Sequence, residues 1–361
     1  MQKKRTAFVT FFPIFPNNMG SSEVVNSRFL NWPGKKKLFQ ISHLKEINNK
    51  KIETIKINFE SPLRKIFKLP LLIYKLKNYL KNAKDKTLII EGASWIFYSF
   101  FVLISLKTIL SDCKIIYISH SIESQIRKKY SNKFIYILTI ILENLVFKLA
   151  NISTSVSFKE KIKLKKLYNI NTVFYSNGIN LKFKKKKKKI SGNYIIFSGS
   201  YLYKPNRDAI DFLNEKIMPE LIKFYPNLKL VITGGGYDRK FPWVIYKNVV
   251  PKNELYNLIH FSKCMCVPLK FGSGTRIKIM EALSLGAIVI SSKKGIEGLK
   301  LLNKNPPFIY KNKKNFIEMI KLVLSNHKKI KKRSNQDKKF YVNKFSMKKI
   351  TTNFIKTTLI K

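Results

Sequence analysis

The sequence is poor in acidic residues. Only 20 of its 361 residues are Asp or Glu, against 71 Lys and Arg, which gives a formal net charge of +51. Arginine is scarce as well, since it supplies only eight of these basic residues. Because arginine makes the bidentate contacts to phosphates and base edges, a dedicated nucleic-acid binder would use more of it. We therefore do not expect nucleic acid as the partner, and we attribute most of the charge to a general abundance of lysine.

Cysteine and long apolar runs are also in short supply. Cys113, Cys264 and Cys266 cannot build a disulfide framework, which favours a reducing compartment. The apolar run at residues 95–106 falls well short of the ~20 residues that a membrane-spanning helix needs. The apolar start of the chain contains Pro13 and lacks a small-residue cleavage site, so it indicates a first β-strand rather than a signal peptide. We expect a cytoplasmic protein.

What the chain does contain is an alternation of short apolar runs and longer helical stretches. In the first half, strands are predicted at residues 7–12, 54–57, 87–90, 114–119 and 152–155, and helices at 71–80, 94–110 and 134–149. In the second half, strands are predicted at 194–197, 229–233, 263–268 and 287–291, and helices at 208–224 and 276–285. This pattern is typical of α/β proteins with a doubly wound parallel sheet. Six consecutive lysines, 184–189, separate the two halves and predict a solvated linker.

The segment with the most chemical information is residues 268–286. It reads as a strand, a glycine-containing loop and a helix that carries Arg276, Lys278 and Glu281. Amides at such a helix start, together with Thr275, can hold phosphate oxygens, and the two cations can neutralise a diphosphate. The carboxylate lies almost two turns further on, where it can accept hydrogen bonds from ribose hydroxyls. The alternative is an ordinary strand–turn–helix with an exposed glutamate.

The whole segment resembles the donor-site signature of the family-four glycosyltransferases, the glycosyl transferases group 1. Three further stretches are similar to the family in order and spacing. They are residues 197–206, which resemble the opening strand and loop of the family's C-terminal domain, 228–236, which resemble its next strand and glycine turn, and 295–299, which resemble a later loop. The resemblance therefore covers most of the second half of the chain.

This resemblance implies a GT-B fold, with two Rossmann-like doubly wound domains that face a central cleft. It also implies a nucleotide-sugar donor held mainly by the C-terminal domain. Glu281 would be the ribose ligand, the helix start from Gly274 would form part of the diphosphate site, and Gly235 and Gly236 would flank the nucleotide. The sequence departs from the family at Ser273, where many members have a glutamate that faces the donor sugar, so the identity of that sugar is open.

The first half resembles the family more weakly. Gly20 lies in the place of the family's glycine-containing loop, and His120 opens a His-x-x-Glu sequence directly after a predicted strand. The resemblance gives His120 a catalytic role, hydrogen bonding to the transferred sugar, although a lone histidine at a strand end is more often structural. The expected donor-binding residues are Gly20, Gly235, Gly236, Ser273, Gly274, Thr275, Arg276, Lys278 and Glu281.

The resemblance also sets the expected domain boundaries. They are an acceptor-side domain at residues 1–181, a lysine-rich linker at 182–191, a nucleotide-sugar-binding domain at 192–340, and a terminal helix at 341–361 that packs back on the first domain.

The expected reaction is glycosyl transfer to an acceptor hydroxyl with retention of configuration, in the synthesis of an envelope polysaccharide or glycolipid. The six aspartates include no Asp-x-Asp pair, so no metal site and no cofactor are expected. Two alternatives stay open. One is a nucleotide-sugar epimerase with a GT-B-like fold, which would convert the donor without an acceptor. The other is a polyanion-binding protein without catalysis, which only the charge supports.

The partners that follow are a nucleotide-sugar donor and a sugar, lipid-linked or polysaccharide acceptor. An anionic membrane surface is a further expected partner, because lysines around residues 65–77 stand beside apolar residues. A basic segment of this kind can lie at a lipid surface, where each nearby lysine contributes about 1 kcal/mol. The enzyme would then sit peripherally on the inner face of the cell membrane. The alternative is that these apolar residues face the domain core.

Overall fold

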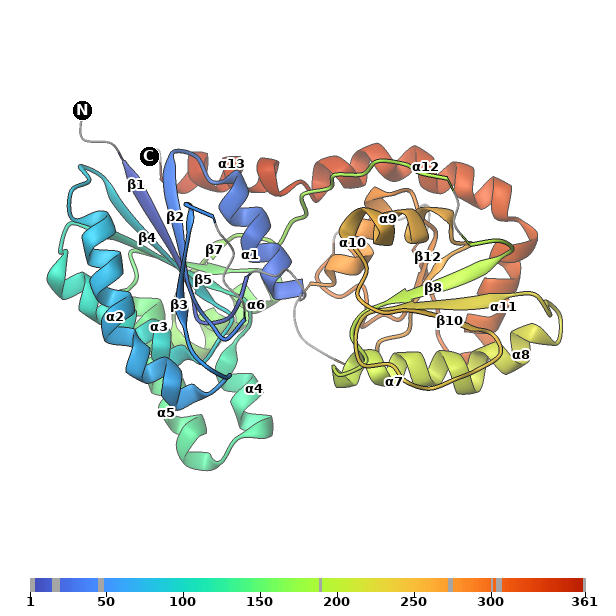
Figure 1. Cartoon of the computed structure of the whole chain (residues 1–361), viewed down its shortest axis with the longest axis horizontal. Helices are drawn as coiled ribbons and strands as arrows, with labels where there is room; N and C mark the ends of the chain where they lie inside the picture. The colour runs from blue at the N-terminus through green and yellow to red at the C-terminus, as the bar shows by residue number, and fades with distance from the viewer. Residues whose placement is uncertain are drawn as a thin grey trace. The chain divides into compact units, whose positions relative to one another are not determined.

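The computed structural model describes residues 4–14, 20–44, 49–187, 190–271, 275–299, 301–302 and 307–359. Within it the chain divides into two compact units, one formed by residues 1–177 with 350–361 and the other by residues 178–349. Each unit has a parallel β-sheet with helices along the connections between its strands (Figure 1). The α/β fold class that the alternating pattern predicts is confirmed.

The first unit is built on a seven-stranded sheet in the order β3-β2-β1-β4-β5-β6-β7, with every described pair parallel. Its strands are β1 (Arg5–Thr10), β2 (Lys35–Ser42), β3 (Ile52–Lys56), β4 (Lys86–Gly92), β5 (Lys114–Ser119), β6 (Ile152–Ser155) and β7 (Val173–Phe174). The central strands are apolar on both faces, as expected for a parallel sheet covered on both sides.

Two apolar cores flank this sheet. On one face pack α2 (Pro62–Leu80), α3 (Ile96–Ile109), α5 (Lys133–Leu149) and α6 (Phe158–Tyr168), and on the other α1 (Gly20–Asn31) and the end of α13 (Met347–Thr358). The short α4 (Glu123–Tyr130) leads into α5. Alternation along each strand decides which core a side chain joins, so Ile89 faces α1 while Leu88 and Ile90 face α2 and α3.

The second unit has a six-stranded parallel sheet in the order β10-β9-β8-β11-β12-β13. Its strands are β8 (Tyr194–Ser198), β9 (Lys229–Thr233), β10 (Val244–Lys247), β11 (Met265–Val267), β12 (Val289–Ser291) and β13 (Phe308–Ile309). Its helices are α7 (Lys204–Phe212), the π-turn η1 (Leu213–Ile217), α8 (Met218–Ile222), α9 (Lys252–Phe261), α10 (Ile277–Ser284), α11 (Lys313–Ser325) and α12 (His327–Lys344). One continuous apolar core joins the described strands and helices of this unit.

The sequence prediction places β5, β6 and β9 at their observed bounds but misses other elements. Strand β2 was not predicted because it opens with three lysines, residues 35–37, and only its second half is buried. Helix α2 begins at Pro62, well before the predicted residue 71, and it continues through Pro70, which lies on the exposed side of the helix. The single helix predicted at residues 208–224 begins at Lys204 and is interrupted by a π-turn.

Among the described residues, no helix combines the length and the apolar character needed to cross a membrane.

Candidate functional site

The carboxyl edge of the second sheet brings together two loops that are far apart in sequence. Strands β8 and β9 run in register, with Ser198 opposite Thr233. Beyond them, the amide of Gly199 donates to the carbonyl of Thr233 at 2.8 Å, and the amide of Tyr201 donates to the carbonyl of Gly235 at 2.9 Å. The loop after β8 therefore lies against the glycine turn after β9. In open parallel sheets this edge is where ligands bind.

The glycine turn needs two of its three glycines for backbone reasons. Gly234 has a φ of 118° and Gly236 a φ of 87°, both in the region that favours glycine. A Cβ atom on Gly234 would lie 2.5 Å from the carbonyl carbon of Gly199, and one on Gly236 would lie 2.6 Å from Leu202. A Cβ atom on Gly235 would have its nearest neighbours, on Asn248 and Val249, 3.8 Å away. Gly235 thus leaves open space at the turn, while Gly236 shapes its backbone.

Helix α10 places a lysine at the same edge. The Lys278 ammonium donates to Oδ1 of Asn206 at 2.9 Å and lies 4.3 Å from the ring centroid of Phe197. A Cβ atom on Gly199 would be 2.6 Å from the Asn206 amide and 2.7 Å from the Lys278 ammonium. The absence of a side chain at Gly199 therefore makes room for this cation. Lys278 thus lies next to Gly199, whose loop lies against the glycine turn after β9.

Both cations of this helix start are held in an environment that disfavours their charge. Burial, followed by repulsion from Arg276, lowers the pKa of Lys278 to about 7, although Glu281 acts in the opposite direction. Burial also lowers the pKa of Arg276, against the attraction of Tyr203 and Glu297. An anion bound here would favour the protonated form of Lys278. The site is thus chemically suited to a phosphate-bearing ligand.

Glu281 is buried, with 3% of its surface exposed. Its Oε1 accepts a hydrogen bond from the hydroxyl of Tyr256 at 3.1 Å and lies 2.6 Å from the ammonium of Lys252, both on α9. The alternative of an exposed helix glutamate is therefore wrong. Neither partner on α9 was identified from the sequence, because no local pattern links α9 to α10.

The remaining predicted donor-site residues of the second unit come from the segment before α10. Ser273 and Gly274 lie outside the described residues. Thr275 is described and is partly exposed just before α10.

In the first unit, His120 directly follows β5 and 11% of its side chain is exposed. Its Nε2 lies 2.6 Å from Oε2 of Glu91, the penultimate residue of β4. The same oxygen is 2.6 Å from Nη1 of Arg28 on α1, and both Glu91 and Arg28 are fully buried. The sequence analysis missed both Arg28 and Glu91. The one signal available was Glu91 itself, a single carboxylate at the end of an apolar strand.

Gly20 is the exposed first residue of α1, and a Cβ atom there would meet nothing within 4 Å.

Glu123, the last residue of the His-x-x-Glu sequence, has a structural role. Its carboxylate accepts from the amide of Ile96 at 2.7 Å, at the start of α3, and from Nε of Arg127 at 3.0 Å. Burial raises the pKa of Glu123 to about 7, although Arg127 opposes this effect. The buried carboxylate of Glu143 in turn accepts from the amide of Glu123 at 2.6 Å. These contacts position the loop that follows His120.

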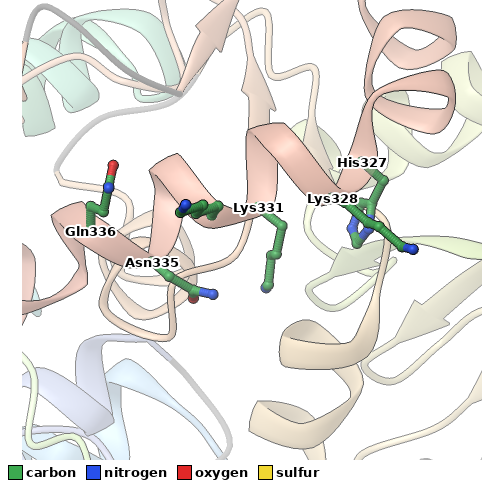
Figure 2. Close-up of a pocket in the computed structure, with 6 residues that line it drawn as sticks. His327, Lys328, Lys331, Asn335 and Gln336 are labelled. Carbon is green, nitrogen blue, oxygen red and sulfur yellow. The ribbon is translucent and has the colours of Figure 1, made fainter.

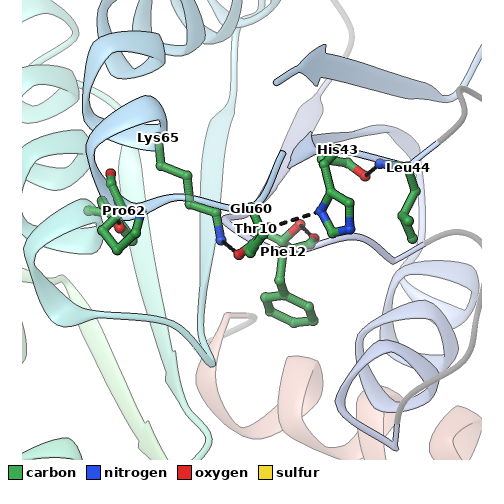
Figure 3. Close-up of polar contacts among 9 residues, drawn as sticks. Thr10, Phe12, His43, Leu44, Glu60, Pro62 and Lys65 are labelled. Atoms are coloured by element: carbon green, nitrogen blue, oxygen red, sulfur yellow. Dashed lines mark hydrogen bonds and ion pairs between the residues drawn. The ribbon is translucent and has the colours of Figure 1, made fainter. Parts of the chain in front are cut away.

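An ion-pair cluster in the first unit and a pocket in the second unit lie outside the predicted site. Figure 3 shows Glu60 between His43 and Lys65, with His43 Nδ1 3.0 Å from Oε2 of Glu60 and Lys65 paired to the other carboxylate oxygen. Figure 2 shows a pocket of about 590 Å³ in the second unit whose lining side chains all come from α12. Its lining residues are His327, Lys328, Lys331, Lys332, Asn335 and Gln336. None of the predicted site residues contributes to it.

Comparisons with known proteins agree with the fold. Residues 192–326 match the family model described as Glycosyl transferases group 1. No curated protein sequence matches the chain. The solved structure of Anabaena Alr3699/HepE in complex with UDP and glucose is similar, with a TM-score of 0.71 and 11% identity over 99% of this chain and 100% of that one.

Two other solved structures have similar scores. WaaG, described as a glycosyltransferase involved in lipopolysaccharide biosynthesis, has a TM-score of 0.67 and 12% identity, covering 98% of this chain and 99% of its own. TarM has a TM-score of 0.69 and 11% identity, covering 99% of this chain and 98% of its own. At these identities the likeness establishes a shared GT-B fold.

Proposed function

We propose that the chain, which has the GT-B fold and matches the glycosyl transferases group 1 model over residues 192–326, is a glycosyltransferase that moves a sugar from a nucleotide-sugar donor to an acceptor hydroxyl. The observation that carries the proposal is the placement of Lys278 beside Gly199 and the glycine turn. A cation beside open backbone at the carboxyl edge of a parallel sheet is suited to a diphosphate.

Each predicted donor-site residue of the second unit has a role in this proposal. Arg276 and Lys278 neutralise the diphosphate, and the carboxylate of Glu281 accepts hydrogen bonds from the ribose. Gly235 and Gly236 flank the nucleotide, and Ser273, Gly274 and Thr275 complete the loop that approaches the phosphates. Residues 192–340 are then the nucleotide-sugar-binding domain, joined by the linker 182–191 to an acceptor-side domain at 1–181. The terminal helix expected at 341–361 is α13 (Met347–Thr358), because the first residues of that range still belong to α12. In that first domain, Gly20 belongs to the loop facing the donor phosphate.

The proposed catalytic role of the two cations follows from the negative charge that develops on the leaving diphosphate. As the glycosidic bond breaks, the leaving diphosphate gains negative charge, so Arg276 and Lys278 stabilise the transition state more than the ground state. These two cations supply the positive charge without a divalent metal ion. We propose retention of configuration, with the acceptor attacking on the face that the diphosphate leaves and a phosphate oxygen taking the acceptor proton. His120 hydrogen-bonds the transferred sugar.

A transfer assay with and without acceptor tests the proposal. Purified protein is screened for binding of UDP-sugars by thermal shift, because a ligand that binds only the folded state raises the melting temperature. The bound donor is then incubated with candidate acceptors, and free nucleoside diphosphate is measured. Release that depends on acceptor, and that is lost in Lys278→Met, supports transfer. Conversion of the donor sugar without acceptor would instead indicate the epimerase.

The proposed electrostatics also predict behaviour without metal. Turnover should persist in excess EDTA, because Arg276 and Lys278 provide the cationic groups at the diphosphate. The measurement is the initial rate of nucleoside diphosphate release after extensive chelation. Complete loss of turnover in EDTA, restored by Mg²⁺ or Mn²⁺, would contradict this assignment.

We further propose that the acceptor is lipid-linked or part of an envelope polysaccharide, and that the protein acts peripherally at the inner face of the cell membrane. The described role of WaaG in lipopolysaccharide biosynthesis supports this class of acceptor. The first unit offers a suited surface, an apolar stripe along α2 formed by Leu63, Phe67, Leu71 and Tyr74. Phe67 is 79% exposed, which is unusual for an aromatic residue without a partner surface.

An exposed lysine and further exposed apolar side chains accompany this stripe on the same side of the sheet. Lys77 is exposed beside the stripe on α2, and Phe134, Ile137 and Ile141 are exposed on α5 on the same side of the sheet (Figure 1). Anionic lipid is the occupant that fits both the apolar side chains and the net charge of +51. The apolar residues Leu69 and Leu72, which the sequence also placed at this surface, are instead buried in the core.

A further inference from the structure

The first unit contains a buried carboxylate that contacts both an arginine and a histidine. Oε2 of Glu91 lies 2.6 Å from Nη1 of Arg28 and 2.6 Å from Nε2 of His120. Glu91 and Arg28 are both 0% exposed. Burying an ionised carboxylate is costly unless charged and hydrogen-bonded partners compensate for it. The ion pair with Arg28 compensates part of this cost. The same oxygen of Glu91 also contacts His120, which follows the neighbouring strand β5.

The fold builds this contact from parallel pairing. In the register of β4 and β5, Glu91 lies opposite Ile118 and Gly92 opposite Ser119, so His120 follows one position beyond the paired strands. Alternation along β4 places Ile89 on the face covered by α1, and Glu91, two residues on, shares that face with Arg28. The ring of a tyrosine, Tyr175, holds the guanidinium on its other side, 4.7 Å from the ring centroid.

Arg28 is itself fixed in place. Its Nη2 donates to Oδ1 of Asn177 at 3.4 Å, and the Tyr175 ring beneath it stacks on Phe354 with centroids 4.2 Å apart. The hydroxyl of Tyr175 is hydrogen-bonded to Thr351 at 2.9 Å. The guanidinium therefore has little freedom to move away from Glu91. A carboxylate between a fixed guanidinium and an imidazole fixes the imidazole too.

The protonation of the pair follows from the charges. Burial acts to raise the pKa of Glu91, but Arg28 and His120 outweigh it and hold that pKa below its ordinary value. An ionised carboxylate has no proton to donate, so Nε2 of His120 must be the donor. In a neutral imidazole the other nitrogen, Nδ1, then carries the lone pair. Within the described residues, Nδ1 of His120 has no hydrogen-bond partner.

We propose that Glu91 is the positioning residue of the transfer reaction: it occupies Nε2 of His120, so that His120 meets the transferred sugar through Nδ1 as a hydrogen-bond acceptor. The inference rests on the proposed function, and it adds the ring nitrogen that is used and the residue that selects it. Glu91 acts only through His120, because a fully buried carboxylate has no access to a substrate. Arg28 keeps Glu91 ionised.

A double-mutant cycle tests this assignment. Glu91→Gln retains the size of the side chain, but its amide can donate to Nε2 and so favours the opposite tautomer of His120. The expected loss in kcat is about 10–100-fold, by analogy with carboxylates that orient metal-binding histidines, with the KM for the nucleotide sugar within about twofold. In a His120→Ala background, Glu91→Gln should lower kcat no further, because its effect passes through the missing ring.

Two further variants separate positioning from folding. Glu53→Gln makes the same carboxylate-to-amide change at a side chain paired with Lys37 at 2.6 Å, on the edge strand β3 of the same sheet, and should leave kcat unchanged. If Glu91→Gln does not fold, Glu91→Asp keeps a negative charge to compensate Arg28 and withdraws the carboxylate from both Arg28 and His120 by one methylene. It should lower kcat only when His120 is present. Equal losses of kcat with and without His120, or no loss at all, would overturn the proposal.

A readout that needs no turnover keeps this test apart from that of the proposed function. In ¹⁵N-histidine spectra of the folded protein, neutral His120 should carry its proton on Nε2 in the wild type and shift toward Nδ1 in Glu91→Gln. An unchanged tautomer in the variant overturns the inference even if the enzyme is active. Absence of donor binding and of transfer in a protein that shows the expected tautomer shift would overturn the proposed function alone.

Discussion

Lys278 is the side chain whose charge depends most on what occupies the second unit's site. Its pKa of about 7 means that the amine is largely neutral at pH 8 when the site is empty. A bound diphosphate favours the charged form and so raises this pKa, and binding must then take up a proton. UDP affinity should therefore be greatest near pH 7 and fall as the pH rises to 9, by up to about tenfold per pH unit.

Calorimetry in buffers of different ionisation enthalpy measures this proton uptake directly. At pH 8, wild-type protein should take up close to one proton per UDP bound. Lys278→Met should bind more weakly and show neither the uptake nor the pH dependence between 7 and 9. Wild-type affinity that stays constant over this range would show that Lys278 does not contact the phosphates.

Glu281 combines a proposed ligand role with structural contacts to α9. Glu281→Ala should weaken UDP binding by about 1.5–3 kcal/mol, the range for a hydrogen bond to a charged group. It should also lower the melting temperature, because the Tyr256 hydroxyl and Lys252 lose their shared partner. Tyr256→Phe is the matched control, since it removes a structural contact and leaves the carboxylate for ribose. Equal UDP affinities for wild type and Glu281→Ala would remove Glu281 from the site.

At the scale of the element, helix α2 has two faces with different partners. Leu69, Leu72 and Leu76 are buried against the sheet, while Phe67 and Leu71 project outward at 79% and 41% exposure. Helical periodicity alone could not tell these faces apart, because apolar residues occur on both. The outer face is the one available to a lipid surface.

Replacing the outer apolar residues should weaken membrane binding without loss of fold. Leu63→Ser with Phe67→Ser should lower co-sedimentation with anionic vesicles, because a Phe or Leu side chain transferred from water contributes about 1.5–3 kcal/mol. Leu322→Ser, on α11 of the second unit and 48% exposed in the wild type, is the matched control. Binding should also fall with rising salt and be weak on neutral vesicles. Equal co-sedimentation of both variants would mean that α2 does not dock.

At the scale of the whole molecule, the chain returns to its first unit at its end. Residues 350–361 belong with residues 1–177, and Phe354 stacks on Tyr175 and lies 6.3 Å from Trp32, centroid to centroid. The end of α13 thereby covers the face of the sheet that also holds α1. Stability of the first unit therefore depends on the last residues of the sequence.

Truncating this contact should destabilise the first unit selectively. Phe354→Ala, made in a Trp243→Phe background so that Trp32 and Trp95 report on the first unit, should lose about 3–5 kcal/mol in urea unfolding. Phe316→Ala removes a fully buried phenylalanine from the second unit and should leave the Trp32 and Trp95 transition in place. An unchanged midpoint in Phe354→Ala would show that the terminal segment adds little to the first unit.

The sequence by itself determined the fold class and the central strands, and it is the source of the proposed donor loop. Buried parallel strands such as β5 and β9 are short apolar runs that stand out locally, and a strand, glycine loop and helix in succession are contiguous in residues 268–286. Edge strands such as β10 and β13 escaped detection, because a strand covered on fewer sides needs fewer apolar residues. Strand β2, which lies next to the edge strand β3, escaped because it opens with three lysines.

Only the tertiary structure decided which polar residues meet. Arg28 and Glu91 are 63 positions apart, and Lys278 and Asn206 are 72 apart, so no local spacing relates them. The sequence around a lone carboxylate in an apolar strand does not show whether that carboxylate is paired or exposed. Glu281 likewise has the sequence context of an exposed helix residue, and only the packing of α9 against α10 buries it. The physical reason is that periodicity reports which face of an element is apolar, whereas the partner of a buried charge is chosen by sheet order and helix packing.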